Sequence, residues 1–256
     1  MMKRFAVLLY GVISYALFFA TFLYLIGFVG NLLVPTSLDG PLEVPLWQAM
    51  LTNILLILLF GVQHSIMARQ WFKKWWTKYV PQSIERSTFV LFTVSVLTTL
   101  FAFWQPMGGE VWVIENGFLS GALMAVFALG WVIALISTFM INHFDLFGLR
   151  QVWFYFRGKP YEPLRFRIPL FYKWVRHPLY VGFMLSFWAA PTMSFSRLFF
   201  ALGLTIYILR AIRLEERDLI EHFGEKYRQY AERVPMLLPF GKKKRSPAYE
   251  TLMKGE

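Results

Sequence analysis

Six apolar segments divide this chain, and they limit its possible folds more than any other feature. Two of them, residues 5–29 and 118–141, exceed the roughly 20 residues that a helix needs to cross a bilayer. The other four need flanking residues or neighbouring helices to cross: 47–62, 88–104, 178–193 and 198–212. Helices satisfy their own backbone hydrogen bonds in lipid. In a chain that is 57% hydrophobic, these segments predict an all-α integral membrane protein.

We expect a bundle of five to six transmembrane helices that ends in a short helical hairpin. The hairpin joins the last two segments at Pro191-Thr192-Met193-Ser194 and crosses the membrane fully or only in part. The first segment starts with Lys3 and Arg4, as a signal peptide would. Its apolar part is too long for one and lacks a small-residue cleavage site. Residues 1–241 are expected to form a single membrane domain, and residues 242–256 a mobile cytoplasmic tail.

Basic residues are distributed unevenly between the loops. If the N-terminus lies inside and all six segments cross, the outer loops are 30–46, 105–117 and 194–197. These loops hold four acidic residues, and only one of the 26 Lys and Arg residues of the chain, Arg197. Cytoplasmic loops of membrane proteins carry an excess of Lys and Arg. The pattern therefore predicts that both termini are cytoplasmic.

Composition excludes several classes of function. The formal net charge of +11 comes from residues that flank apolar segments, such as Lys73, Lys74 and Lys78. It indicates membrane topology and attraction to anionic lipid, not nucleic-acid binding. No cysteine is present, which excludes disulfides, thiolate metal sites and a cysteine nucleophile. No metal site and no obligatory protein partner are indicated.

The string Arg176-His177-Pro178-Leu179-Tyr180 precedes the fifth apolar segment. Proline is favoured in the first turn of a helix, so Pro178 predicts a helix start with His177 at the N-cap. An anion is stabilised at such a helix end. Tyr180 follows His177 by three residues and can face the same side. The alternative is an interfacial anchor without a binding role.

Glu215 and Glu216 follow the last apolar segment directly, at the same membrane level as His177. Arg213 lies three residues before Glu216, so we expect one glutamate to pair locally while the other points back toward the hairpin. Ionisable groups at a membrane boundary are costly and are often functional. A solvated helix with local ion pairs is the alternative. Together with His177 and Tyr180, the pair favours a binding site.

The C-terminal part of the chain resembles the isoprenylcysteine carboxyl methyltransferase family of integral membrane enzymes. The resemblance rests on four elements in order: Arg176 to Tyr180, Glu215-Glu216, Gly224/Tyr227/Tyr230 and Val234-Pro235. It implies that these elements frame an S-adenosylmethionine pocket within residues 142–240. The cofactor-binding residues it implies are Arg176, His177, Pro178, Leu179, Tyr180, Arg213, Glu215, Glu216, Tyr227 and Tyr230.

Three further strings resemble the bacterial methanethiol S-methyltransferase branch of these enzymes. They are His64-Ser65-Ile66-Met67-Ala68-Arg69, Glu85-Arg86-Ser87-Thr88-Phe89-Val90-Leu91, and Phe144-Asp145-Leu146-Phe147-Gly148-Leu149-Arg150-Gln151-Val152. The resemblance extends over most of residues 60–240. It implies a bacterial inner-membrane enzyme that methylates methanethiol to dimethyl sulfide.

A thiol acceptor reacts as its thiolate, so the site needs a group that takes the proton or holds the sulfur. The candidates lie at predicted inner boundaries: His64, His143, Asp145, Arg150 and Gln151. Each has a structural alternative, such as a helix cap for Asp145 or His143. The aromatic run Trp153-Phe154-Tyr155-Phe156 favours an interfacial belt over a substrate cage.

Other functions remain open at this point. A prenylcysteine or lipid methyltransferase would use the same cofactor site with a larger acceptor tunnel. NnrU-like membrane proteins carry similar strings, so a non-catalytic or haem-associated protein of that group is a further alternative. The histidines lie at membrane edges, whereas axial haem ligands would have to face each other at mid-depth.

Overall fold

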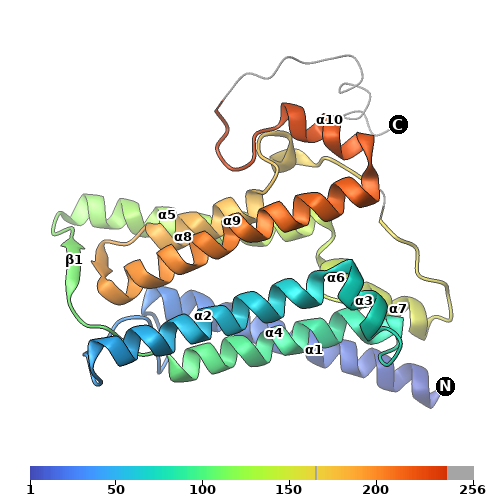
Figure 1. The fold of residues 1–256 in the computed structure, drawn as a ribbon, viewed down its shortest axis with the longest axis horizontal. Helices are drawn as coiled ribbons and strands as arrows, with labels where there is room; N and C mark the ends of the chain where they lie inside the picture. The colour runs from blue at the N-terminus through green and yellow to red at the C-terminus, as the bar shows by residue number, and fades with distance from the viewer. Residues whose placement is uncertain (165, 241–256) are drawn as a thin grey trace.

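A computed structural model describes residues 1–164 and 166–240 of the chain, which form a helical membrane bundle (Figure 1). Five helices are long and apolar enough to cross a bilayer: α1 (Met2–Gly30), α2 (Leu46–Ala68), α4 (Gln82–Phe103), α5 (Gly117–Ile141) and α9 (Phe195–Phe223). The prediction of an all-α integral membrane protein is confirmed. The tail expected at residues 242–256 lies outside the described residues.

The fifth apolar segment differs from its expected form. It folds into α8 (Pro178–Trp188), whose 11 residues span only about 16 Å at 1.5 Å per residue. The chain then passes through Ala189 and Ala190 to Pro191, which cannot continue a helix. Residues after it form β2 (Thr192–Ser194), paired antiparallel with β1 (Glu110–Val113). The strand pair was not predicted, because four residues give too short a sequence signal.

Side-chain contacts join separate segments of the chain at one end of the bundle. This end carries β1 (Figure 1). Asp39 accepts hydrogen bonds from Asn31 and Ser194, and Arg197 is buried with its guanidinium 3.7 Å from the Asp39 carboxylate. Asn53 bonds the backbone of Gln105 in both directions. The Asp39 contacts fasten the hairpin tip to the first loop, and the Asn53 contacts fasten α2 to the segment after α4.

Small residues let α5 and α8 pack closely. A Cβ added to Gly130 would lie 2.6 Å from the Gly182 carbonyl oxygen, and one added to Gly182 would lie 2.5 Å from that of Gly130. Ser186 donates a hydrogen bond to the Phe127 carbonyl at the same crossing. Such close backbone approach is typical of helix pairs in membranes. It fixes the depth and direction of α8, and hence the place of its first residue.

The opposite end of the bundle carries the N-terminus and the short polar elements (Figure 1). These are α3 (Gln70–Trp76), α6 (His143–Leu146), α7 (Leu149–Phe156), the 3-10 turn η1 (Leu170–Lys173) and α10 (Glu225–Arg233). We call this end the inner face. All the candidate site residues of the sequence lie on or near these elements.

Candidate functional site

The N-terminus of α8 has the predicted form. Pro178 is the first helical residue and His177 is the N-cap. The His177 side chain is buried, with 4% of its area exposed. Its Nε2 lies 2.9 Å from Glu216 Oε1, and its Nδ1 lies 3.9 Å from Glu215 Oε2. The imidazole therefore sits between the two carboxylates of α9.

Both glutamates reach α8, so the expected local pairing of one of them with Arg213 is not observed. Arg176 makes a bidentate ion pair with Glu216, through Nε at 2.6 Å and a terminal nitrogen at 3.2 Å. The Tyr180 hydroxyl donates to Glu215 Oε2 at 3.0 Å. Arg213 is exposed on α9. We call Arg176, His177, Tyr180, Glu215 and Glu216 the carboxylate centre.

The two glutamates differ in how many hydrogen-bond acceptor positions they keep free and in how exposed they are. Glu216 accepts hydrogen bonds from Arg176 and His177, and 19% of its side chain is exposed. Glu215 accepts one, from Tyr180, and 42% of its side chain is exposed. Because an ionised carboxylate has about four acceptor positions, Glu215 keeps most of its capacity for a ligand.

The chain after α10 closes over the carboxylate centre. Arg176 donates to the Val234 carbonyl at 2.9 Å, and its backbone N–H donates to that of Pro235 at 2.9 Å. Tyr227 and Tyr230 are 2% and 3% exposed and pack together, and the Tyr230 hydroxyl donates to the Tyr172 carbonyl. Burial raises the pKa of the Tyr227 hydroxyl, and nearby Glu216 adds to the shift. Tyr227 therefore lies near the carboxylate centre, and Tyr230 packs on Tyr227.

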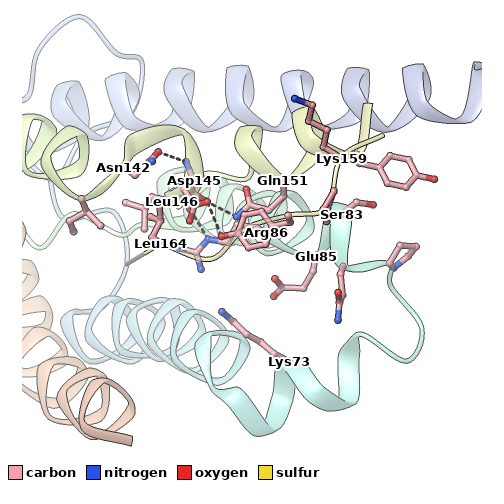
Figure 2. A pocket seen from close by; sticks show the side chains of 16 residues that line it. Lys73, Ser83, Glu85, Arg86, Asn142, Asp145, Leu146, Gln151, Lys159 and Leu164 are labelled. Carbon is pink, nitrogen blue, oxygen red and sulfur yellow. Dashed lines mark hydrogen bonds between the residues drawn. The ribbon is translucent and has the colours of Figure 1, made fainter. Parts of the chain in front are cut away.

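A cavity of about 760 Å³ opens at the inner face between α3, α4 and the α6–α7 segment (Figure 2). We call it the inner-face cavity. Pro81, Gln82 and Lys159 on its wall are exposed, so it reaches solvent. Its charged lining residues are Lys73, Glu85, Arg86, Asp145 and Lys159. Of the residues predicted to deprotonate or hold the thiol, Asp145 and Gln151 line this cavity, and Arg150 binds Asp145.

Asp145 is the centre of a small polar cluster on this wall. Its Oδ1 accepts from Arg150 at 3.0 Å and from the Tyr161 hydroxyl at 2.9 Å. Gln151 donates to its carbonyl at 3.1 Å (Figure 2). Burial and the bond to Asp145 raise the pKa of Tyr161 to about 12, so this hydroxyl remains a donor at neutral pH. Asn142, and not Asp145, caps α6.

His143 lies apart from the cavity in an aromatic cluster, with 2% of its area exposed. The Thr138 hydroxyl donates to the Leu135 carbonyl, so it accepts from His143 Nδ1 at 2.7 Å. Nε2 then accepts from the Tyr15 hydroxyl at 2.8 Å. Burial also lowers the pKa of His143. A neutral imidazole with both nitrogens engaged has the surroundings of a structural residue.

His64 lies on α2 against α4. Its Nδ1 is 3.2 Å from the Thr93 hydroxyl, and its ring packs on Phe60 and Phe89. It does not line the inner-face cavity. The acceptor candidates therefore divide into three separate environments.

An ion pair connects the carboxylate centre with the cavity wall. Arg69, at the start of α3, binds Asp218 of α9 at 3.0 Å. Asp218 is one helical turn from Glu215, and Arg69 is about one turn from Lys73. The Arg69–Asp218 pair therefore adjoins the carboxylate centre on one side and the cavity wall on the other. Glu215 also acts electrostatically on Tyr172, whose pKa is raised mainly by burial.

Among the residues that line the cavity, the sequence did not single out Lys73, Glu85, Arg86 or Tyr161 as site residues. The available signal was the pair Glu85-Arg86 immediately before an apolar segment, at the same boundary as the predicted site. Basic residues are common at inner boundaries for reasons of topology, so their presence alone does not predict a site.

Comparisons with known proteins bear on this arrangement. The methanethiol S-methyltransferase of Crocosphaera subtropica is 52% identical, over 94% of this chain and 95% of its own length. That of Mycobacterium tuberculosis is 49% identical, over 93% and 98%. Nurim of Xenopus laevis is a more distant relative, 30% identical over 71% of this chain. No family model matches the chain, and no solved structure does. With half of its residues shared over nearly its whole length, this chain belongs to the methanethiol S-methyltransferase family of membrane-embedded methyltransferases.

Proposed function

We propose that this protein transfers a methyl group from S-adenosylmethionine to methanethiol, giving dimethyl sulfide, at the cytoplasmic face of a bacterial inner membrane. The names of its relatives support the acceptor. The carboxylate centre supports S-adenosylmethionine as the methyl donor, and the proposal depends on this observation. The inner-face position of both the centre and the cavity, together with the excess of Lys and Arg on that side, supports the cytoplasmic orientation.

The donor set of the carboxylate centre suits the cofactor. Glu215 offers free acceptor positions for ribose hydroxyls or for the ammonium group, and charge-assisted hydrogen bonds of this kind are the strong ones. Tyr180 orients this carboxylate. Arg176 and His177 hold Glu216, which fixes the α9 backbone beside it. S-adenosylmethionine would supply a methyl group that is already activated by its sulfonium charge.

The remaining task of the protein is to orient the acceptor sulfur in line with that methyl group. Such positioning needs neither a protein nucleophile nor a metal ion. The inner-face cavity adjoins the carboxylate centre through the Arg69–Asp218 pair, so we assign the acceptor to the cavity.

Product formation by purified protein tests the proposal. We expect detergent-solubilised protein, supplied with methanethiol and S-adenosylmethionine carrying a deuterated methyl group, to release dimethyl sulfide that contains one labelled methyl, as measured by headspace mass spectrometry. A prenylcysteine acceptor, assayed in parallel by liquid chromatography and mass spectrometry for a labelled methyl ester, should give no product. Transfer to the prenylcysteine alone would replace the proposed acceptor, and transfer to neither would refute the function.

A further inference from the structure

Arg86 forms no ion pair with a described carboxylate, although the charges of Glu85 and Asp145 act on it. It lies near the start of α4 and lines the inner-face cavity. Its Nε donates to the Leu146 carbonyl at 2.6 Å, and its guanidinium packs over the Phe89 ring. In the described part of the chain, its two terminal nitrogens have no hydrogen-bond partner. A guanidinium held by a single neutral acceptor still has most of its donors to offer.

Lys73 lies on the facing wall, on α3, and also lines the cavity. Its ammonium group makes no hydrogen bond or ion pair with a described residue. Burial lowers its pKa, and Arg86 lowers it further, while Glu85 and Asp218 act in the opposite direction. The two cations therefore stand close enough to repel each other, an arrangement that an anion between them would stabilise.

The other charges of the cavity do not neutralise this pair. Asp145 is already paired with Arg150 and accepts from Tyr161. Lys159 adds a further positive charge at the exposed rim. Glu85 is the one lining carboxylate that is left to balance Lys73, Arg86 and Lys159. Beyond the lining, Glu215 and the Arg69–Asp218 pair lie on the side of α9. The cavity keeps an excess of positive charge.

Gln151 supplies a neutral group on the same wall. Its Nε2 donates to the Asp145 carbonyl, which leaves its Oε1 buried and without a hydrogen-bond partner among the described residues. An unsatisfied buried acceptor costs about 1–3 kcal/mol. A thiol that enters protonated can offer its S–H to this oxygen.

We propose that Arg86 and Lys73 form an anion-binding site that holds the acceptor in the cavity as a thiolate. The inference rests on the proposed function, because it takes the acceptor to be a thiol. The thiol proton passes to water at the open side of the cavity. The thiolate lone pair forms the new S–C bond, and the electron pair of the broken sulfonium S–C bond stays on the donor sulfur. No protein group has to act as the base.

Kinetics of variants at the two cations test this site. We expect Lys73→Met to raise the KM for methanethiol about tenfold at pH 7, equivalent to about 1.4 kcal/mol, with the KM for S-adenosylmethionine unchanged. Lys74→Met is the matched control, because Lys74 is exposed on the same helix and does not line the cavity. It should behave as the parent protein.

Arg86→Gln gives the second test, through its pH profile. We expect kcat/KM for methanethiol to fall about 100-fold at pH 7 and the deficit to shrink as the pH rises to 10, because solvent then supplies the thiolate that the guanidinium no longer stabilises. A purely structural role would give a deficit that does not depend on pH. Lys73 makes no hydrogen bond with a described residue, so its variant remains informative if Arg86→Gln does not fold.

Three results would overturn the inference. One is an unchanged KM for methanethiol in Lys73→Met, with an active parent protein. Another is a rise in the KM for S-adenosylmethionine alone, which would mean that the two cations bind the carboxylate group of S-adenosylmethionine and not the thiolate. The third is an inactive parent protein, which would remove the proposed function and this inference with it.

Discussion

Replacing Glu216 by alanine should destabilise the protein more than any other single change in the carboxylate centre. The substitution leaves Arg176, 12% exposed, and His177, 4% exposed, without their carboxylate partner. Breaking a fully buried ion pair costs about 3–5 kcal/mol. Because both side chains of the pair keep some exposure, we expect about 2–4 kcal/mol here, seen as a fall in Tm of roughly 5–15 °C.

Thermal unfolding in detergent, followed by the loss of helical circular dichroism, measures this change. Glu225→Ala is the matched control: Glu225 forms an ion pair with Arg228 in which both side chains are more than 60% exposed. Exposed pairs contribute little, so its Tm should stay close to that of the parent. Equal Tm values for the two variants would contradict the role given to Glu216.

Gly148→Ala should disrupt the α6–α7 turn and abolish most of the activity. Gly148 has φ of +89°, and a Cβ there would lie 2.6 Å from Ser87 Oγ and 2.8 Å from the Ser87 backbone nitrogen. A side chain would be strained in this conformation and would push the turn away from α4. Because the turn carries Asp145, Arg150 and Gln151, we expect at least a tenfold loss of turnover, together with a loss of stability of about 1–3 kcal/mol.

Gly121→Ala is the control for this prediction. Gly121 lies in α5, and a Cβ there meets nothing within 4 Å, so alanine should be tolerated or slightly stabilising. Full activity of Gly148→Ala in the product assay would show that the turn does not position the cavity wall.

Local signals explain what the sequence could predict. Long apolar segments require helices in lipid, so the spans follow from hydropathy alone. Pro178 marks a helix start through its own geometry, and His177 at the N-cap follows from it. Arg176 and Glu216 are 40 residues apart in the chain. The sequence predicts only that both lie at the same depth in the membrane. The pairing itself depends on how α8 and α9 pack.

The sequence could not predict the cavity, because residues far apart in the chain build it. Lys73 and Arg86 have the positions of ordinary inner-boundary cations, and only the fold shows that they line one cavity. The surroundings of His143 also follow only from the fold. Its partners Tyr15 and Thr138 lie on other helices, and they leave neither ring nitrogen free. A role for His64, His143, Asp145, Arg150 or Gln151 in deprotonating or holding the thiol stays a prediction.

Equilibrium binding of S-adenosylmethionine to the detergent-purified protein tests the central claim most directly. Calorimetric titration of the parent protein should show saturable binding at one site per chain. Glu215→Gln removes the free carboxylate charge while keeping the shape of the side chain. We expect it to weaken binding at least about tenfold, roughly 1.4 kcal/mol, with no change in Tm, whereas Glu225→Gln should bind as the parent does. Unaltered affinity in Glu215→Gln, or no saturable binding by the parent protein, would contradict the placement of the methyl donor at the carboxylate centre.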